Sequence, residues 1–193
     1  MQQIKLAVPT HPEWVKVLLN DFDAFMSDHA DCERKASAMA MRLVAKCADR
    51  GEIIKPLIDL AIEELGHFRE VYELMKKRGI PLSGGFIDDP YVNELLKFLR
   101  HGRDERFLDY LLVLGIVEAR GAERFQIVYE ALSDPELKDF YRRLHVAETK
   151  HGSLFLRFAS KYFDDTTVQT RLDQLLTEEA RIIQNIEWRP SLH

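Results

Sequence analysis

The chain has 193 residues, of which 46% are hydrophobic and 31% are charged. This length and composition are typical of a globular protein with one domain. Its cysteines, Cys32 and Cys47, are too few for a disulfide framework or a cysteine-based zinc site. The net charge of −5 argues weakly against a nucleic-acid partner. Because the sequence starts without a signal-peptide pattern and has no apolar run of bilayer length, we expect a cytoplasmic protein without membrane contact.

The spacing of apolar residues predicts an almost entirely helical chain, and no strand pattern competes with it. Thr10, followed by Pro12 and Glu13, predicts a helix start with Thr10 as the cap. We expect a break at Asn20-Asp21, and a long helix that ends at Gly51. The remaining helices are expected at about 54–78, 91–100, 104–132, 135–162 and 165–187, and the tail 188–193 is expected to be loose.

The lengths of the connections predict how the four long helices are arranged. Short links near Gly51 and Asp134 make antiparallel neighbours of the first two and the last two long helices. Roughly 25 residues separate the second from the third, which is enough for a crossover. We therefore expect an all-α, ferritin-like four-helix bundle with one long crossover connection plus extra short and C-terminal helices, forming a single domain over residues 1–193.

A lone glutamate followed by Glu-x-x-His occurs twice. The lone glutamate precedes the Glu-x-x-His by 31 residues in the first copy and by 30 residues in the second. Two such copies on four helices make a complete two-metal carboxylate site in the core of a bundle. The pattern consists of Glu33, Glu64, His67, Glu118, Glu148 and His151.

Each of the four glutamates in the pattern lies on the apolar stripe of its predicted helix. Glu63 and Glu123 are rotated away from these stripes and are expected to be solvated. A carboxylate that is buried alone is strongly unfavourable, so four facing one another require neutralisation by two divalent cations. Carboxylate and imidazole ligands suit iron or manganese.

Other residues near the proposed ligands have less specific explanations. His29 and His145 are expected to support the ligands or to be ordinary core residues. Four glycines inside the long helices suggest space kept for a metal cluster or a substrate, although tight helix–helix contact would explain one or two of them. These glycines are Gly66, Gly115, Gly121 and Gly152.

The stretches around the pattern carry a specific resemblance. They comprise residues 28–36, Glu-Glu-Leu-Gly-His-Phe at 63–68, Glu-Ala-Arg at 118–120 and Glu-Thr-Lys-His-Gly at 148–152. With these stretches the chain resembles the bacterial tRNA 2-methylthio-N-isopentenyladenosine hydroxylase family over about residues 6–187. The resemblance implies a non-haem di-iron monooxygenase that hydroxylates the isopentenyl group of this nucleoside next to the anticodon. It implies two iron ions held by the six residues (manganese is possible), O2 as co-substrate, and an external reductase or ferredoxin as electron donor.

A tRNA anticodon stem-loop as partner requires phosphate contacts and an aromatic surface. The cluster from Lys97 to Arg106 lies at the end of the crossover and is the preferred place, although solvated helix faces explain each basic residue as well. We expect a monomer or a small homo-oligomer. The candidate basic residues are Lys76, Lys77, Arg78, Lys97, Arg100, His101, Arg103, Arg106, Arg142, Arg143, Arg157 and Lys161.

Other functions remain open for the same residue pattern. Iron storage or detoxification uses such a bundle but requires a self-assembling cage. A peroxidase of the rubrerythrin type commonly carries a Cys-x-x-Cys module, which this sequence lacks. A manganese catalase or another small-molecule di-metal oxygenase has the same ligand set. In a metal-free helical interaction protein, the Glu-x-x-His pairs would be ordinary polar core pairs.

Overall fold

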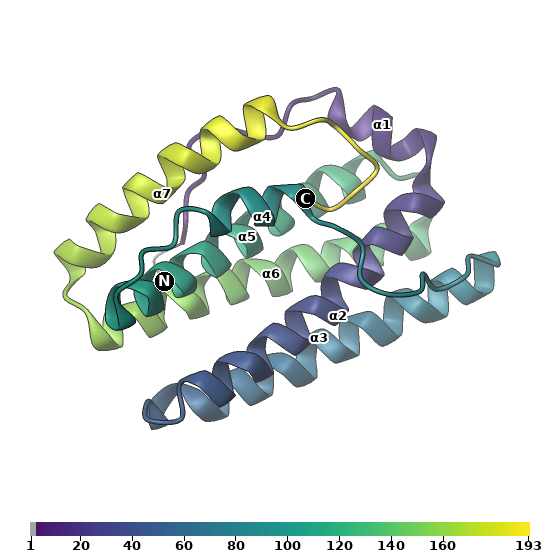
Figure 1. Cartoon of the computed structure of the whole chain (residues 1–193). Helices are drawn as coiled ribbons and strands as arrows, with labels where there is room; N and C mark the ends of the chain where they lie inside the picture. Colours follow the sequence, from purple (N-terminus) through teal and green to yellow (C-terminus); the bar gives the residue numbers. More distant parts are fainter. Residues whose placement is uncertain (1–2) are drawn as a thin grey trace. The chain divides into compact units, whose positions relative to one another are not determined.

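The computed structural model describes residues 3–193, in which there are seven α-helices and no strand. The expected all-α class is therefore confirmed. Within the described part of the chain, none of the helices has the length and apolar character needed to cross a membrane. The helices are α1 (Trp14–Asn20), α2 (Phe22–Lys46), α3 (Gly51–Arg78), α4 (Pro90–Leu96), α5 (Arg103–Ala131), α6 (Pro135–Tyr162) and α7 (Asp165–Asn185) (Figure 1).

The helices belong to two compact units. The α2–α3 unit comprises residues 16–88 and 188–192. The α5–α6 unit comprises residues 89–187, residue 193 and the N-terminal segment up to residue 15. A single domain over residues 1–193 remains a prediction.

The α2–α3 unit is an antiparallel helical hairpin (Figure 1). The expected break before α2 is confirmed, because the Asp21 side chain accepts a hydrogen bond from the Ala24 N–H at 3.1 Å and caps the helix. The expectation that the first long helix ends at Gly51 is wrong. That helix ends at Lys46, and Gly51 is the first residue of α3, because the turn after Cys47 already reverses the chain.

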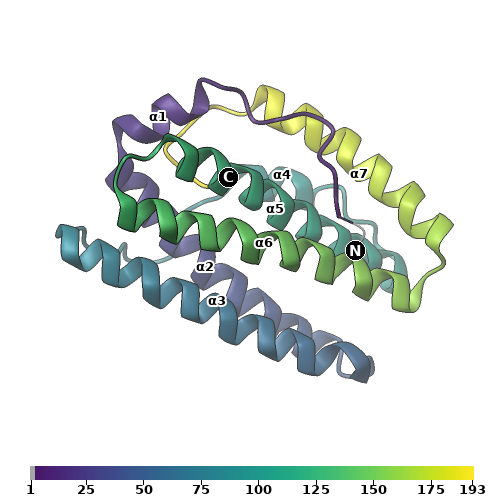
Figure 2. The same cartoon turned by 180° about the vertical axis from the view of Figure 1, so that it is seen from behind.

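Helices α5 and α6 also form an antiparallel pair, and α4 and α7 pack together and against α5 (Figure 2). The turn between α5 and α6 is the one that the sequence predicts. Asp134 accepts hydrogen bonds from the backbone N–H groups of Glu136 and Leu137, and Pro135 occupies the first helical position. Asp164 caps α7 in the same way.

The N-terminal segment runs over the α5–α6 pair and differs from the prediction (Figure 2). Helix α1 begins at Trp14, and Thr10 does not cap it. Instead, the backbone N–H and the hydroxyl of Thr10 donate to the Glu123 carboxylate at 2.9 and 2.7 Å. Glu123, which was expected to be solvated, also pairs with Arg120 and is only 23% exposed. These donors offset the cost of removing the carboxylate from water.

The C-terminal tail, residues 188–193, is packed and not loose. In the α2–α3 unit, the Leu192 N–H donates to the Asp28 carboxylate at 2.7 Å, and the Leu192 side chain is buried. In the α5–α6 unit, the His193 ring stacks on Tyr91 with 5.6 Å between ring centroids. The tail is therefore a fixed part of the fold.

Helices α5 and α6 approach to backbone contact at two glycines. A Cβ at Gly152 would lie 3.2 Å from the Gly115 carbonyl oxygen, and one at Gly115 would lie 2.7 Å from the Ile4 side chain. For these two glycines the structure supports tight helix–helix contact, the alternative that the sequence left open for one or two of the four. A Cβ at Gly66 would meet no described atom within 4 Å, and one at Gly121 would lie 3.6 Å from His193.

Candidate metal centre

The α2–α3 unit brings together the first three residues of the pattern, Glu33 from α2 and Glu64 and His67 from α3. Each offers a ligand atom within 4.8 Å of the others. The Nδ1 atom of His67 lies 3.1 Å from a Glu64 oxygen and 3.6 Å from a Glu33 oxygen. Both carboxylates are buried. The i, i+3 spacing places Glu64 and His67 on one face of α3, and the hairpin brings Glu33 opposite them.

The α5–α6 unit brings together the other three residues, Glu118 from α5 and Glu148 and His151 from α6. Their ligand atoms also lie within 4.8 Å of one another, and the His151 Nδ1 atom is 3.2 Å from a Glu148 oxygen. All three side chains are buried. The Cβ of Glu118 is only 3.7 Å from the position of a Cβ on Gly152. The close approach of α5 and α6 therefore fixes the backbone from which these ligands project.

His29 supports the carboxylate of Glu33. Its Nε2 atom lies 2.7 Å from Glu33 Oε1, and both side chains are almost fully buried. A hydrogen bond of this kind fixes the orientation of a carboxylate that binds a metal. His145 has another role, because its Nδ1 atom donates to the Ala122 carbonyl oxygen at 2.9 Å and joins α6 to α5.

The donor set of each unit fits a metal ion. Each offers two buried carboxylates and one imidazole, which is the ligand type that iron and manganese accept. Two carboxylates in one buried cluster repel each other, and a neutral imidazole does not cancel their charge. A divalent cation would remove this repulsion and use the imidazole nitrogen as a further ligand.

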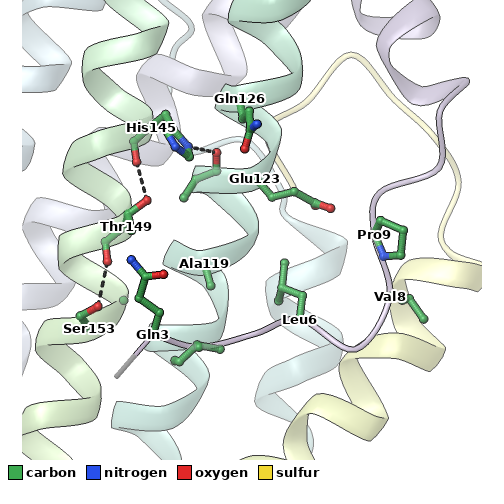
Figure 3. Close-up of a pocket in the computed structure, with 13 residues that line it drawn as sticks. Gln3, Leu6, Val8, Pro9, Ala119, Glu123, Gln126, His145, Thr149 and Ser153 are labelled. Carbon is green, nitrogen blue, oxygen red and sulfur yellow. Dashed lines mark hydrogen bonds between the residues drawn. The ribbon is translucent and has the colours of Figure 1, made fainter. Parts of the chain in front are cut away.

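A cavity of about 360 Å³ lies in the α5–α6 unit, between the N-terminal segment and the two helices (Figure 3). Ala119 and Gly152 line its wall. Ala119 directly follows Glu118, and Gly152 directly follows His151, so the cavity borders the carboxylate–imidazole triad of this unit. The lining is both apolar and polar. It consists of Gln3, Ile4, Leu6, Val8, Pro9, Ala119, Ala122, Glu123, Gln126, His145, Thr149, Gly152 and Ser153.

The chain matches the tRNA-(MS[2]IO[6]A)-hydroxylase (MiaE) family over residues 1–193. It belongs to this family. It is 32% identical over 191 residues to a tRNA 2-(methylsulfanyl)-N(6)-isopentenyladenosine(37) hydroxylase of Pseudomonas putida, a match that covers 97% of this chain and 91% of the relative. A hydroxylase of the same name from Salmonella typhimurium is 32% identical over 110 residues, which are 57% of this chain and 40% of that relative.

A solved structure resembles the whole chain. It is titled "Protein 43 with aldehyde deformylating oxygenase activity from Synechococcus", and it matches with a TM-score of 0.89 and 32% identity over 98% of this chain and 96% of that one. The expected ferritin-like fold class is thereby confirmed. With its family, the chain is an oxidoreductase.

The sequence did not predict that two arginines of this MiaE-family chain are buried. Arg120 is fully buried and donates to Glu179 at 2.7 Å, and the Tyr91 hydroxyl donates to the same carboxylate at 3.0 Å. Burial and the charge of Glu179 raise the pKa of Tyr91 well above its usual value. Arg124 lies over the Trp14 ring at 4.5 Å, and burial, together with the charge of Arg120, lowers its pKa to about 10. The sequence signal that could have identified them is their spacing, since the two arginines lie one turn apart on a largely apolar helix.

The preferred basic cluster contains one residue with a structural role. Arg100 forms a bidentate salt bridge with the buried Asp109. The same carboxylate accepts a hydrogen bond from Arg171 Nε at 2.7 Å. Burial would raise the pKa of Asp109, but the hydrogen bonds from the two arginines outweigh burial and lower it. Arg100 therefore holds the start of α5 in place, whereas Arg103 and Arg106 are exposed.

Proposed function

We propose that the chain is an O2-dependent di-iron monooxygenase that hydroxylates the isopentenyl side chain of 2-methylthio-N-isopentenyladenosine next to the anticodon in tRNA. Membership of the MiaE family over the whole chain is the observation that carries this proposal. The two buried carboxylate–imidazole triads support it, because they supply the ligands that a di-iron oxygenase needs.

The two triads together are proposed to hold two iron ions. Their four carboxylates carry four negative charges, which two divalent cations balance. When bound, the metal pair supplies the activation of O2 that no side chain provides. The protein orients the ligands, excludes water from them through burial, and fixes the Glu33 carboxylate through His29. The proposed ligands, and hence the proposed catalytic residues, are Glu33, Glu64, His67, Glu118, Glu148 and His151.

The proposed reaction converts one C–H bond of the isopentenyl group into C–OH. One atom of O2 enters the product, and the other leaves as water after taking up two electrons and two protons. The electrons are proposed to come from an external reductase or a ferredoxin, because the sequence carries no flavin, haem or iron–sulfur motif. We place the reaction in the cytoplasm, with the tRNA anticodon stem-loop as the macromolecular partner.

A nucleoside digest of tRNA tests the function directly. In cells that lack this protein, we expect the unhydroxylated isopentenyl nucleoside to accumulate. A wild-type copy should restore the hydroxylated nucleoside, and a Glu64→Ala copy should not. A normal hydroxylated pool in the deleted cells, with the precursor present, would overturn the tRNA proposal.

Aldehyde deformylation is a second candidate, because the Synechococcus structure with that activity is also 32% identical to this chain. One experiment separates the two. The iron-loaded protein receives the same reductant and O2 with either an aliphatic aldehyde or an anticodon stem-loop that carries the isopentenyl nucleoside. Hydroxylated RNA supports the first candidate, whereas loss of the formyl carbon from the aldehyde with unchanged RNA supports the second.

A further inference from the structure

The segment between α3 and α4 is fastened to α2 within the α2–α3 unit. We call residues 80–88 the crossover segment. Its Ile87 N–H donates to the buried Asp31 carboxylate at 2.7 Å, and Asp31 also pairs with Arg34 and Lys35. These two cations donate in turn to backbone carbonyl oxygens of the segment. A stretch without secondary structure is thus held in one position by charged hydrogen bonds.

This fixed segment presents an aromatic ring to solvent. Phe86 is 67% exposed, more than any other large hydrophobic residue in the described part of the chain. The guanidinium carbon of Arg34 lies 4.9 Å from the centre of its ring. A flat ring backed by a guanidinium group, on a backbone that is held in place, is an arrangement on which another planar group can stack.

Cations gather along the crossover segment. Arg189, which follows the 39% exposed Trp188, donates to the Asp88 carbonyl oxygen at 3.5 Å. The last turn of α3, immediately before the segment, is basic. Acids lie among them as well, of which Asp31 pairs with Arg34 and Lys35, and Asp23 pairs with Arg78. The cations are Arg34, Lys35, Lys76, Lys77, Arg78 and Arg189.

We propose that the crossover segment is the RNA-contacting surface, on which Phe86 stacks an unpaired base of the anticodon loop while the surrounding cations take its phosphates. This inference rests on the proposed function. Proteins read single-stranded RNA loops by stacking splayed bases on aromatic rings and arginine planes, and Phe86 with Arg34 offers both. The exposed cations Lys76 and Lys77, in the last turn of α3, complement the phosphate backbone.

The position of Arg34 on α2 agrees with the proposed role of the crossover segment in binding RNA. Arg34, which backs the ring, directly follows Glu33, a proposed metal ligand. One short stretch of helix therefore carries both a group for the metal and a group for the RNA. This surface replaces the 97–106 cluster as the preferred one, because Phe86 is 67% exposed, whereas Phe98 of that cluster is 36% exposed.

Binding of a fluorescent anticodon stem-loop to the full, iron-loaded chain tests the proposal. We expect Phe86→Ala to weaken binding by about 10- to 100-fold, the loss of one stacked base, and Phe86→Trp to bind like the wild type. The matched control is Ile62→Ala, since Ile62 is 65% exposed on α3 of the same unit and should not matter. In hydroxylation, Phe86→Ala should raise KM and change kcat little.

Measuring Kd at several salt concentrations tests the proposed contacts between the cations and the phosphates. Replacing Lys76 and Lys77 with Gln should reduce the dependence of log Kd on log salt by about one unit for each phosphate that the protein no longer binds. If Phe86→Ala binds and reacts like the wild type while the wild type hydroxylates the stem-loop, this inference fails and the proposed function stands. A wild type that neither binds nor hydroxylates the stem-loop overturns both.

Discussion

The Nε2 atom of His29 lies 2.7 Å from Oε1 of Glu33, one turn further along α2. Since this hydrogen bond orients a proposed ligand, we expect His29→Ala to weaken metal binding by about 10- to 100-fold. Titration of the metal-free protein with ferrous iron measures the effect. The control is His101→Gln, because His101 is exposed. Equal affinities in His29→Ala and the wild type would show that the hydrogen bond has no such role.

Replacing one proposed ligand in each unit should remove most of the bound iron. We expect this of Glu64→Ala and of His151→Ala, because each change deletes a buried donor of the proposed site. Metal analysis of the purified variants measures it. Glu63→Ala is the control, since Glu63 is the exposed neighbour of Glu64. Two full equivalents of iron in either ligand variant would refute the assignment.

Two glycines in long helices should respond oppositely to alanine. Gly152→Ala should destabilise the protein by about 1–3 kcal/mol, because its Cβ would lie 3.2 Å from the Gly115 carbonyl oxygen and force α5 and α6 apart. Gly66→Ala should stabilise it by up to about 1 kcal/mol, because its Cβ would meet no atom of residues 3–193 within 4 Å and alanine favours the helix. Urea unfolding measures both. The same sign for both changes would contradict the packing described for Gly152.

The contact of Asp109 with Arg100 and Arg171 should make stability depend on pH. The folded state lowers the pKa of Asp109, so its contribution is complete above the unfolded value of about 3.9 and is lost as the pH falls through the folded value. We expect Asp109→Asn to reduce the free energy of unfolding by about 2 kcal/mol at pH 7. That difference from the wild type should shrink below about pH 4. Urea unfolding at several pH values measures it, and a constant difference would contradict the assignment.

Features with a local cause could be read from the sequence. The cap at Asp134 and the Glu-x-x-His pairs follow from residues within one helical turn, and the structure shows the expected geometry in each unit. Each unit also assembles its own lone glutamate with its own pair, because the hairpin links are short. The arrangement of all six residues around two metals remains a prediction.

Features that depend on distant residues could not be read in this way. Glu123 lies on a face that the helical period assigns to solvent, but its donor Thr10 is 113 residues away. The tail was expected to be loose, yet the Leu192 N–H meets Asp28 across 164 residues. Helical periodicity reports the face of a residue and not the segment that covers it.

The positions of the two tryptophans allow the cooperativity of the fold to be measured. Trp14 is 1% exposed in the α5–α6 unit, and Trp188 is 39% exposed in the α2–α3 unit. Two variants, each with one of them replaced by Phe, would therefore report the unfolding of one unit at a time by intrinsic fluorescence. Coincident transitions would establish a single cooperative domain, whereas separate midpoints would reveal two that melt independently.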